Sequence, residues 1–195
     1  TDLLADEKDF WVIHKPAGFP VHDSVDNIRE NLLRTLEEQL KIELFITHRL
    51  DVPTEGLILY AKNAEFQKKF NEALTKKRTR KIYRAELCRC EGSSLTPSLL
   101  THYMKKSFRA PKELTNEPLI NTQECQLKIL NIKASPQNNL EVEIDLLTGR
   151  THQIRAQMSY VGHPVVNDTL YGAPPLSTDN KIHLTAEQLQ FEIDN

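Results

Sequence analysis

The chain has 195 residues, a formal net charge of −2, and 27% charged against 39% hydrophobic residues. This composition is typical of a soluble globular domain, and no apolar stretch approaches the roughly 18–20 residues that cross a bilayer. The near-neutral charge excludes nucleic-acid binding driven by the whole surface, although a local basic groove remains possible. The three cysteines, Cys88, Cys90 and Cys125, are too few for a disulfide framework and predict reduced thiols in a cytoplasmic protein.

The first part of the chain predicts two strands and two helices. Residues 9–13 are aromatic and β-branched and predict a strand, which the Pro and Gly of residues 14–18 end. Asn27 with Glu30 resembles a helix start, and apolar residues at helical spacing continue to Leu40. The apolar run 56–61 predicts a strand buried on both faces, and Asn63 is expected to cap a second helix. The apolar side of that helix comprises Phe66, Phe70, Ala73 and Leu74.

The second part is richer in predicted strands. A basic run over 76–81 leads into a strand over 82–87, and residues 91–117 predict loops and short strands. Apolar residues alternate with polar ones over 124–129 and over 140–146, which predicts two half-buried strands. The polar segment after Gly149 predicts a helix that ends at Tyr160. Because there is no regular βαβ alternation, the fold class is α+β, with a mixed, largely antiparallel sheet and flanking helices.

Asp51 lies in the segment His48-Arg49-Leu50-Asp51, in a predicted loop between two apolar segments. A carboxylate there can emerge from the edge of a rigid sheet into a cleft, where an ionised aspartate can act as a nucleophile or as a base. Ionisation in a partly dry cleft needs an opposite charge nearby. The alternative is that Asp51 caps a turn and that Arg49 is a solvated surface cation.

The segment Arg150-Thr151-His152-Gln153-Ile154-Arg155 is dense in hydrogen-bond donors. Such a set can bind phosphates and orient a carboxylate. Ile154 is its only apolar residue, which argues against pure core packing. The alternative is the polar beginning of a helix on the surface.

Tyr83 lies in the predicted strand that follows the basic run. A tyrosine offers a flat face for stacking on a base and a hydroxyl for proton transfer, although a tyrosine in a strand is more often a core residue. The cations of the basic run can contact phosphates, or they can form a solvated helix end. These cations are Lys76, Lys77, Arg78, Arg80 and Lys81.

Taken together, the motifs resemble the RluA-type family of RNA pseudouridine synthases. The motifs are WVIHKPAGFPVH (11–22), HRLD (48–51), GLILYAKN (56–63), KIYRAEL (81–87) and TGRTHQIRAQMSYVGHPVVNDTLYG (148–172). The resemblance covers about residues 9–193. It implies the pseudouridine synthase fold with a central active-site cleft, as a single catalytic domain over 1–195. We expect no additional RNA-binding domain, and we expect the C-terminal end to be trimmed.

The resemblance also implies the reaction, the isomerisation of a uridine to pseudouridine within RNA. Asp51 takes the place of the catalytic aspartate, which attacks C1′ or removes a proton from C2′. Tyr83 takes the place of the tyrosine that stacks on the target base, and Arg155 that of the arginine that pairs with the aspartate. Arg49 corresponds to an arginine that can enter the RNA stack, and His48 is assigned to the RNA contacts with it.

The partner implied is a structured RNA, because the target uridine must be flipped out and extrusion costs least from a loop. Ribosomal and transfer RNA both fit, and we expect a monomer without a membrane partner. Further predicted RNA contacts are Arg150, Thr151, His152, Gln153 and the basic run. No metal, nucleotide or redox cofactor is implied. The alternative is a non-catalytic RNA-binding module on the same fold.

Several positions depart from the pattern of that family. Ala156-Gln157 replaces the usual Val-His, and Asn167 stands where a Gly is common before Asp168. These departures concern the pocket and the substrate rather than the expected catalytic groups. The spacing of the histidines matches no usual set of metal ligands, and hydrogen-bonded or surface histidine is the better interpretation. These histidines are His102, His152, His163 and His183.

Overall fold

The computed structural model describes residues 2–21, 32–177 and 181–194. The chain forms two compact units, of which unit 1 comprises residues 1–80 and 185–195 and unit 2 comprises residues 81–184. The described part of the chain contains no helix long and apolar enough to cross a membrane. The prediction of one catalytic domain over 1–195 stays a prediction beside this division.

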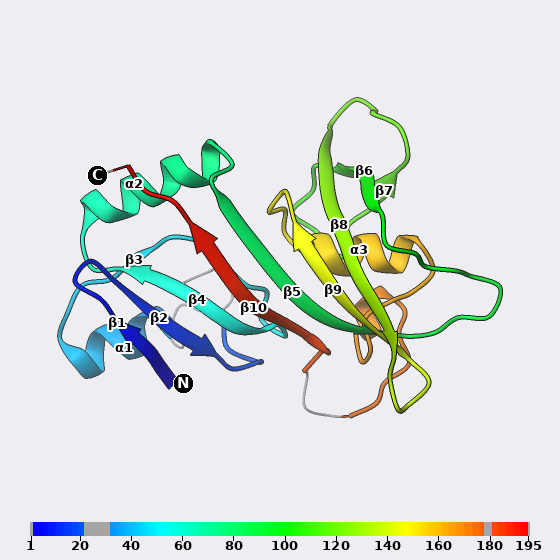
Figure 1. The fold of residues 1–195 in the computed structure, drawn as a ribbon, viewed down its shortest axis with the longest axis horizontal. Coiled ribbons are helices and arrows are strands. Elements are labelled where there is room, and N and C mark those ends of the chain that lie inside the picture. Colours follow the sequence, from blue (N-terminus) through cyan, green and yellow to red (C-terminus); the bar gives the residue numbers. More distant parts are fainter. Residues whose placement is uncertain (1, 22–31, 178–180, 195) are drawn as a thin grey trace. The chain divides into compact units, whose positions relative to one another are not determined.

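Unit 1 is built around a sheet whose most buried strand is β4. The strands are β1 (Asp2–Asp6), β2 (Phe10–Lys15), β3 (Phe45–Ile46), β4 (Glu55–Ala61) and β10 (Leu184–Phe191), and the helices are α1 (Leu32–Leu40) and α2 (Ala64–Thr75). The order is β1-β2-β4-β10, with β3 also paired to β4 (Figure 1). β2 and β3 run antiparallel to β4, whereas β10 runs parallel to it.

The core of unit 1 forms where the sequence predicts it. The second half of β4, from Ile58 to Ala61, is wholly inaccessible to solvent, which confirms the strand buried on both faces. Asn63 caps α2, since its Oδ1 accepts the Phe66 N–H at 2.8 Å. Phe66 and Phe70 then pack on β4. These contacts hold the strand that follows the Asp51 loop.

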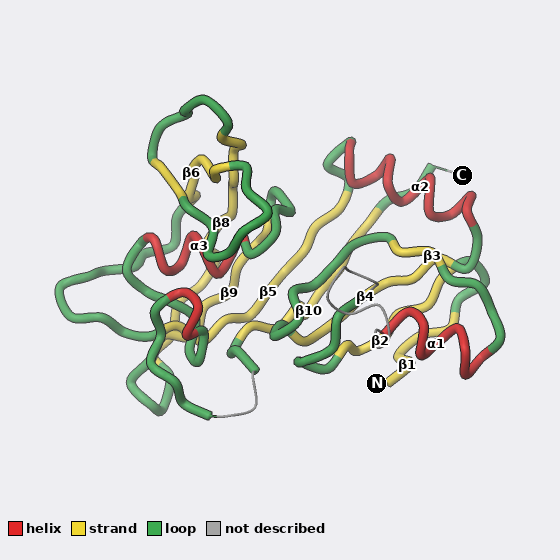
Figure 2. Tube along the Cα trace, turned by 180° about the vertical axis from the view of Figure 1, so that it is seen from behind, coloured by secondary structure: helices red, strands yellow, loops and turns green. Residues whose placement is uncertain are grey.

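Unit 2 consists of an antiparallel sheet and one buried helix. The strands are β5 (Thr79–Leu87), β6 (Leu99–Lys105), β7 (Leu114–Thr115), β8 (Thr122–Ala134) and β9 (Leu140–Leu146), and the helices are α3 (Gln153–Tyr160) and the short 3₁₀ helix η1 (Thr169–Tyr171). The order is β5-β9-β8-β6-β7, with antiparallel neighbours. Figure 2 shows the long loops around β6 and β8 beside α3.

The predicted class, α+β with a mixed, largely antiparallel sheet, is confirmed. The strand predicted over 124–129 is β8, which is longer, and β6 lies in the stretch predicted to hold loops and short strands. The helix expected directly after Gly149 begins at Gln153, because His152 is in the left-handed region with φ 58°. The predicted helix start at 27–30 lies outside the described residues.

Candidate functional site

Asp51 lies in the loop between β3 and β4 of unit 1. The Thr54 N–H donates to the Asp51 carbonyl at 3.1 Å, which closes a turn through Val52 and Pro53. The Asp51 side chain is half-buried. A carboxylate is therefore carried on a short turn directly before the most buried strand of the unit.

The buried Lys15 side chain anchors this turn through hydrogen bonds to backbone carbonyls. Its side chain is fully buried, and its Nζ donates to the carbonyls of Pro16, Phe19 and Val52 at 3.0, 2.8 and 3.1 Å. A protonated lysine has three N–H donors, so each of them has a backbone acceptor. The Gly18 N–H also donates to the Val52 carbonyl, at 2.8 Å. The segment from Lys15 to Gly18 is thereby tied to Val52, the residue that follows Asp51.

The electrostatic setting of Lys15 also involves Asp51. Burial lowers the pKa of Lys15 from 10.5 to about 8, against the opposing attraction of the Asp51 and Glu55 carboxylates. Lys15 is thus a buried cation coupled to the expected catalytic carboxylate within the same unit. Lys15 lies in the motif over residues 11–22, and its burial and its contacts with the Asp51 turn could not be predicted from the sequence.

Gly56 permits the close packing of β4 in this region. Its φ is +119°, and a Cβ at this position would lie 2.2 Å from the Ala186 carbonyl oxygen of β10. Gly56 is the register partner of Lys15 on β2 and of Ala186 on β10. Only a residue without a side chain can bring the three strands together here.

The two other members of the HRLD segment differ in exposure. His48 is half-buried, and its ring stacks on Phe70 with 6.1 Å between centroids. Its Nδ1 lies 3.0 Å from the Thr47 hydroxyl. Arg49 is exposed. An RNA contact by His48 or Arg49 stays a prediction.

The segment around α3 is buried rather than superficial. Residues Gln153 to Met158 are all buried, so the alternative of a polar helix start on the surface is wrong. The Gln153 amide holds the turn: its Oε1 accepts the Arg150 N–H at 3.0 Å, and its Nε2 donates to the Gln126 carbonyl at 3.0 Å. Arg150 and Thr151 are exposed, whereas Gln153 serves the turn.

Arg155 forms a buried ion pair within unit 2. Its Nε and Nη2 donate to the two carboxylate oxygens of Asp168 at 2.7 and 2.9 Å. The side chains of Arg155 and Asp168 are only 4% and 1% exposed. Asp168 therefore neutralises Arg155 from within the unit. The expected pairing of Arg155 with Asp51 stays a prediction, because it joins residues of different units.

Tyr83 lies on β5 opposite Ile144 of β9 and is 6% exposed. Lys81, two residues before Tyr83, is half-buried, and burial lowers its pKa. Its Nζ lies against Gly149, at 3.1 Å from the position that a Cβ would take there. Tyr83, Lys81 and Arg155 thus belong to unit 2, whereas Asp51 belongs to unit 1.

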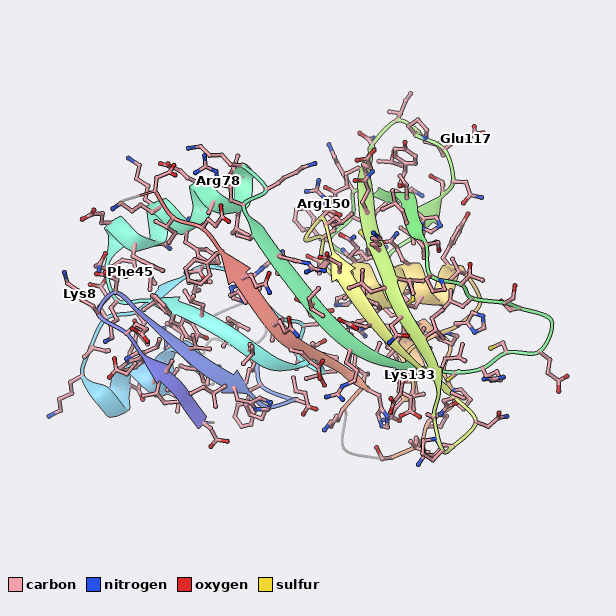
Figure 3. All side chains as sticks on the ribbon, in the orientation of Figure 1. Lys8, Phe45, Arg78, Glu117, Lys133 and Arg150 are labelled. Carbon is pink, nitrogen blue, oxygen red and sulfur yellow. The ribbon has the colours of Figure 1, made fainter. Side chains whose placement is uncertain are left out.

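Two of the remaining cations of the basic run lie beside carboxylates. Arg78 pairs with Asp194, and Lys76 lies 3.8 Å from Asp194 and 3.9 Å from Glu72. Lys77 and Arg80 are exposed. Figure 3 labels Arg78 at the C-terminal end of α2. Carboxylates of the protein therefore compensate part of the positive charge that was predicted to contact RNA.

A basic loop between β6 and β7 carries an exposed aromatic ring that the sequence analysis missed. Phe108 is fully exposed, with Lys106 and Arg109, also exposed, on either side. Interleaved basic and aromatic residues are the signal that could have identified this loop from the sequence. The Lys112 N–H at its end donates to the Tyr171 hydroxyl at 2.9 Å.

The four histidines weighed as metal ligands each lie beside a protein partner. His102 lies 2.9 Å from the Gln157 amide, His152 3.1 Å from the Tyr171 hydroxyl, and His183 2.7 Å from the Glu86 carboxylate. His163 Nδ1 lies 3.1 Å from the Cys88 carbonyl. Across residues 2–21, 32–177 and 181–194, no three His, Cys, Asp or Glu side chains are grouped to hold a metal ion.

Two of the unusual positions have a clear structural use. Asn167 adopts φ 66°, which asparagine tolerates better than most residues, and its Oδ1 accepts the N–H groups of Leu176 and Ser177. Gln157 is fully buried and bonds to Gln153 and His102. The departures are thus accommodated by local hydrogen bonds.

The sequence of this chain is similar to those of known RNA pseudouridine synthases. A family model described as RNA pseudouridylate synthase matches residues 9–160. RNA pseudouridine synthase 6, chloroplastic, of Arabidopsis thaliana is 29% identical over 97% of this chain and 46% of that protein. Ribosomal large subunit pseudouridine synthase D of Yersinia pestis is 31% identical over 89% of this chain and 53% of that protein. The chain thus spans about half the length of these curated relatives.

A solved structure gives the same result for the fold. Human RNA Pseudouridylate Synthase Domain Containing 1 matches with a TM-score of 0.73 and 23% identity, over 98% of this chain and 78% of that one. At this identity the likeness concerns the fold, and it confirms the expected fold.

Proposed function

The chain belongs to the RNA pseudouridylate synthase family, and from this premise we propose that it isomerises a specific uridine in a structured RNA to pseudouridine. The observation that carries the proposal is the extent of the family match, residues 9–160, which includes Asp51, Tyr83 and Arg155. The reaction is an isomerisation: the N1–C1′ bond breaks, the uracil turns, C5 bonds to C1′ and loses its proton, and N1 takes up a proton, so the composition of the nucleotide is unchanged.

In this proposal Asp51 is the catalytic carboxylate. It attacks C1′ of the ribose, or it removes the C2′ proton to give a glycal; both routes need an ionised and oriented carboxylate. Its position on the turn that Lys15 ties down supports the role, because a nucleophile on a clamped turn is already oriented.

Tyr83 and Arg155 complete the proposed site. Tyr83 stacks on the uracil and transfers the C5 proton, and Arg155 binds Asp51 in its ionised form. Within unit 2, Asp168 accepts from the Nε and Nη2 of Arg155 and so fixes the plane of its guanidinium.

The proposed substrate is a loop or bulge of ribosomal or transfer RNA, from which a uridine is extruded at a cost of a few kcal/mol. Ribosomal RNA is the first choice for testing, because the Yersinia pestis relative is named for the large ribosomal subunit. We assign phosphate contacts to the exposed cations Arg49, Lys77, Arg80 and Arg150, and base stacking to Phe108. We further propose a cytoplasmic monomer.

The test is release of tritium from RNA labelled at uridine C5. Total RNA from cells of the source organism that lack this gene is the substrate, and pseudouridine mapping of the same RNA then names the site. Asp51→Asn should abolish release while circular dichroism shows an intact fold. The matched control is Glu43→Gln, which makes the same change at an exposed carboxylate before β3 and should leave the rate unchanged.

Two outcomes would redirect the assignment. Unchanged turnover of Asp51→Asn would remove Asp51 from the catalytic role. Binding of loop RNA by the wild type without pseudouridine in any cellular RNA would favour the alternative, a non-catalytic RNA-binding module on the same fold.

A further inference from the structure

Asp168 and Tyr171 surround the Arg155 guanidinium on two sides. Asp168 accepts from Nε and Nη2, which fixes the plane of the group along one edge. The Tyr171 ring lies against the guanidinium, with Cζ 5.0 Å from the ring centroid, a cation–π arrangement. Rotation of the Arg155 head would break both contacts.

Both partners are themselves fixed by the segment around η1. The Asp168 N–H donates to the Val165 carbonyl at 3.0 Å, and the Asp168 carbonyl accepts from the N–H groups of Tyr171 and Ala173. Asp168 is therefore held by its backbone on both sides, while its carboxylate binds Arg155. A buried aspartate with this anchoring orients its partner more sharply than a surface ion pair would.

Tyr171 is anchored at its other end. Its hydroxyl oxygen accepts the Lys112 N–H at 2.9 Å and lies 3.1 Å from His152 Nδ1, in the residue before α3. Its ring packs with Met104, Cys125 and Ala156. The ring that faces the guanidinium is thus tied to the loop of Phe108 and to the start of α3.

We propose that Asp168 and Tyr171 are positioning residues for the reaction, which hold the Arg155 guanidinium in the orientation that the chemical step needs. The proposal rests on the proposed function, since it assigns both residues an effect on catalysis through Arg155 alone. A small misplacement of an orienting group can lower a rate by about 100-fold. The expected loss is in the rate of the chemical step, whereas RNA binding stays unchanged.

The experiment measures tritium release from the labelled total RNA under single-turnover conditions. The rate at saturating enzyme reports the chemical step, and the enzyme concentration at half-maximal rate reports RNA binding. Asp168→Asn should lower the saturating rate roughly 10- to 100-fold with no change in the half-maximal concentration. Tyr171→Leu should do the same, whereas Tyr171→Phe keeps the ring and should lose no more than a few-fold.

A matched control separates positioning from general stability of unit 2. The Glu86 carboxylate accepts hydrogen bonds from Ser135 and Asn139, at 2.9 and 3.0 Å. Its side chain lies on the opposite face of β5 from Tyr83. Glu86→Gln makes the same carboxylate-to-amide change and should lower the melting temperature without changing the saturating rate.

The double variant tests whether the effect passes through Arg155. Arg155→Ala alone should lose most activity, and adding Asp168→Asn to it should cause no further loss, because the residue to be positioned is gone. Additive losses would contradict the positioning role, as would an unchanged saturating rate in both Asp168→Asn and Tyr171→Leu. If Asp168→Asn fails to fold, the comparison of Tyr171→Leu with Tyr171→Phe tests the positioning role instead.

The failure of the proposed function has a different signature. A wild-type protein that releases no tritium from any RNA contradicts the proposed function and the positioning role with it. A wild type that reacts, together with an inactive Arg155→Ala and a fully active Asp168→Asn, contradicts the positioning role alone.

Discussion

The two units hold their charged functional residues in opposite ways. In unit 1 a buried cation, Lys15, binds main-chain carbonyls and so fixes the backbone beside Asp51. In unit 2 a buried anion, Asp168, binds the side chain of Arg155 directly. Unit 1 therefore orients the Asp51 carboxylate through the backbone turn that carries it. Unit 2 orients the Arg155 guanidinium by direct contact with its donor atoms.

This difference has a consequence for pH. The pKa of Lys15 is lowered to about 8, so the support in unit 1 can lose its charge under mildly alkaline conditions. Arginine stays protonated in proteins, so the guanidinium in unit 2 keeps its charge. The two units are expected to respond differently to the same change of conditions.

The largest expected effect is a loss of stability on replacing a glycine by alanine, which should be much greater in unit 1 than in unit 2. Gly56→Ala should destabilise the protein by about 4 kcal/mol or more, because its Cβ would meet backbone atoms of Ala186 from 2.2 Å. Gly172 of unit 2 also has a positive φ, 92°, but nothing lies within 4 Å of its Cβ position. Gly172→Ala should therefore cost only about 1–2 kcal/mol of backbone strain. Urea unfolding measures both, and equal losses would contradict the comparison.

The second prediction concerns stability against pH. Folding lowers the pKa of Lys15 from 10.5 to about 8, so between these values the unfolded chain binds the proton and the folded chain does not. Stability from this group therefore rises as pH increases from about 8 to 10.5, by about 3 kcal/mol in all. The measurement is the free energy of unfolding of the wild type minus that of Lys15→Met at each pH. A difference that stays flat over this range would refute the shift.

Turnover should change with pH in the opposite direction. A neutral lysine has two N–H donors instead of three, so one carbonyl of the clamp on the Asp51 turn is released above pH 8. Lys15→Met removes the clamp at every pH and should lower the single-turnover rate about 100-fold. The wild-type rate should fall above pH 8, and the variant should lack that limb. A fall in rate above pH 8 that the wild type and Lys15→Met share would be assigned to titration of the RNA.

Local order in both units was predictable from the sequence, whereas the partners of the site residues were not. Asn63 at the start of α2 and the alternation along β9 encode their structure within a few residues. The Lys15–Val52 contact joins residues 37 positions apart, and Arg155 meets Asp168 across a loop. The polarity of residues 150–155 argued against core packing and left a surface helix start as the alternative, because the sequence does not show that the amides of α3 bond to each other and to β8. β1 was missed because it is a short edge strand with two exposed leucines.

The fourth prediction contrasts the binding surfaces, beginning with the loop of unit 2. Phe108→Ala should weaken RNA binding by roughly 10-fold, because stacking on a base contributes about 1–3 kcal/mol, and it should leave the saturating rate unchanged. The control is Leu176→Ala, an exposed apolar residue of the same unit without basic neighbours in sequence. Fluorescence anisotropy of a labelled stem-loop that contains the mapped uridine measures both. Equal affinities for the two variants would exclude Phe108 from the RNA contacts.

The smallest expected effect concerns residues 76–80, the part of the basic run that lies in unit 1. Lys77 is exposed, whereas Lys76 lies within 4 Å of two carboxylates. Each phosphate contact adds roughly 0.7–0.9 to the slope of log affinity against log salt. Lys77→Ala should lower that slope by about this amount, and Lys76→Ala by less than half of it, since Asp194 and Glu72 already compensate its charge. Asp194→Asn should act in the other direction and strengthen RNA binding a few-fold at low salt, because it releases Arg78 and Lys76 together. If Lys76→Ala and Lys77→Ala lower the slope equally, compensation by Asp194 has no bearing on RNA binding, and the whole run contacts phosphate.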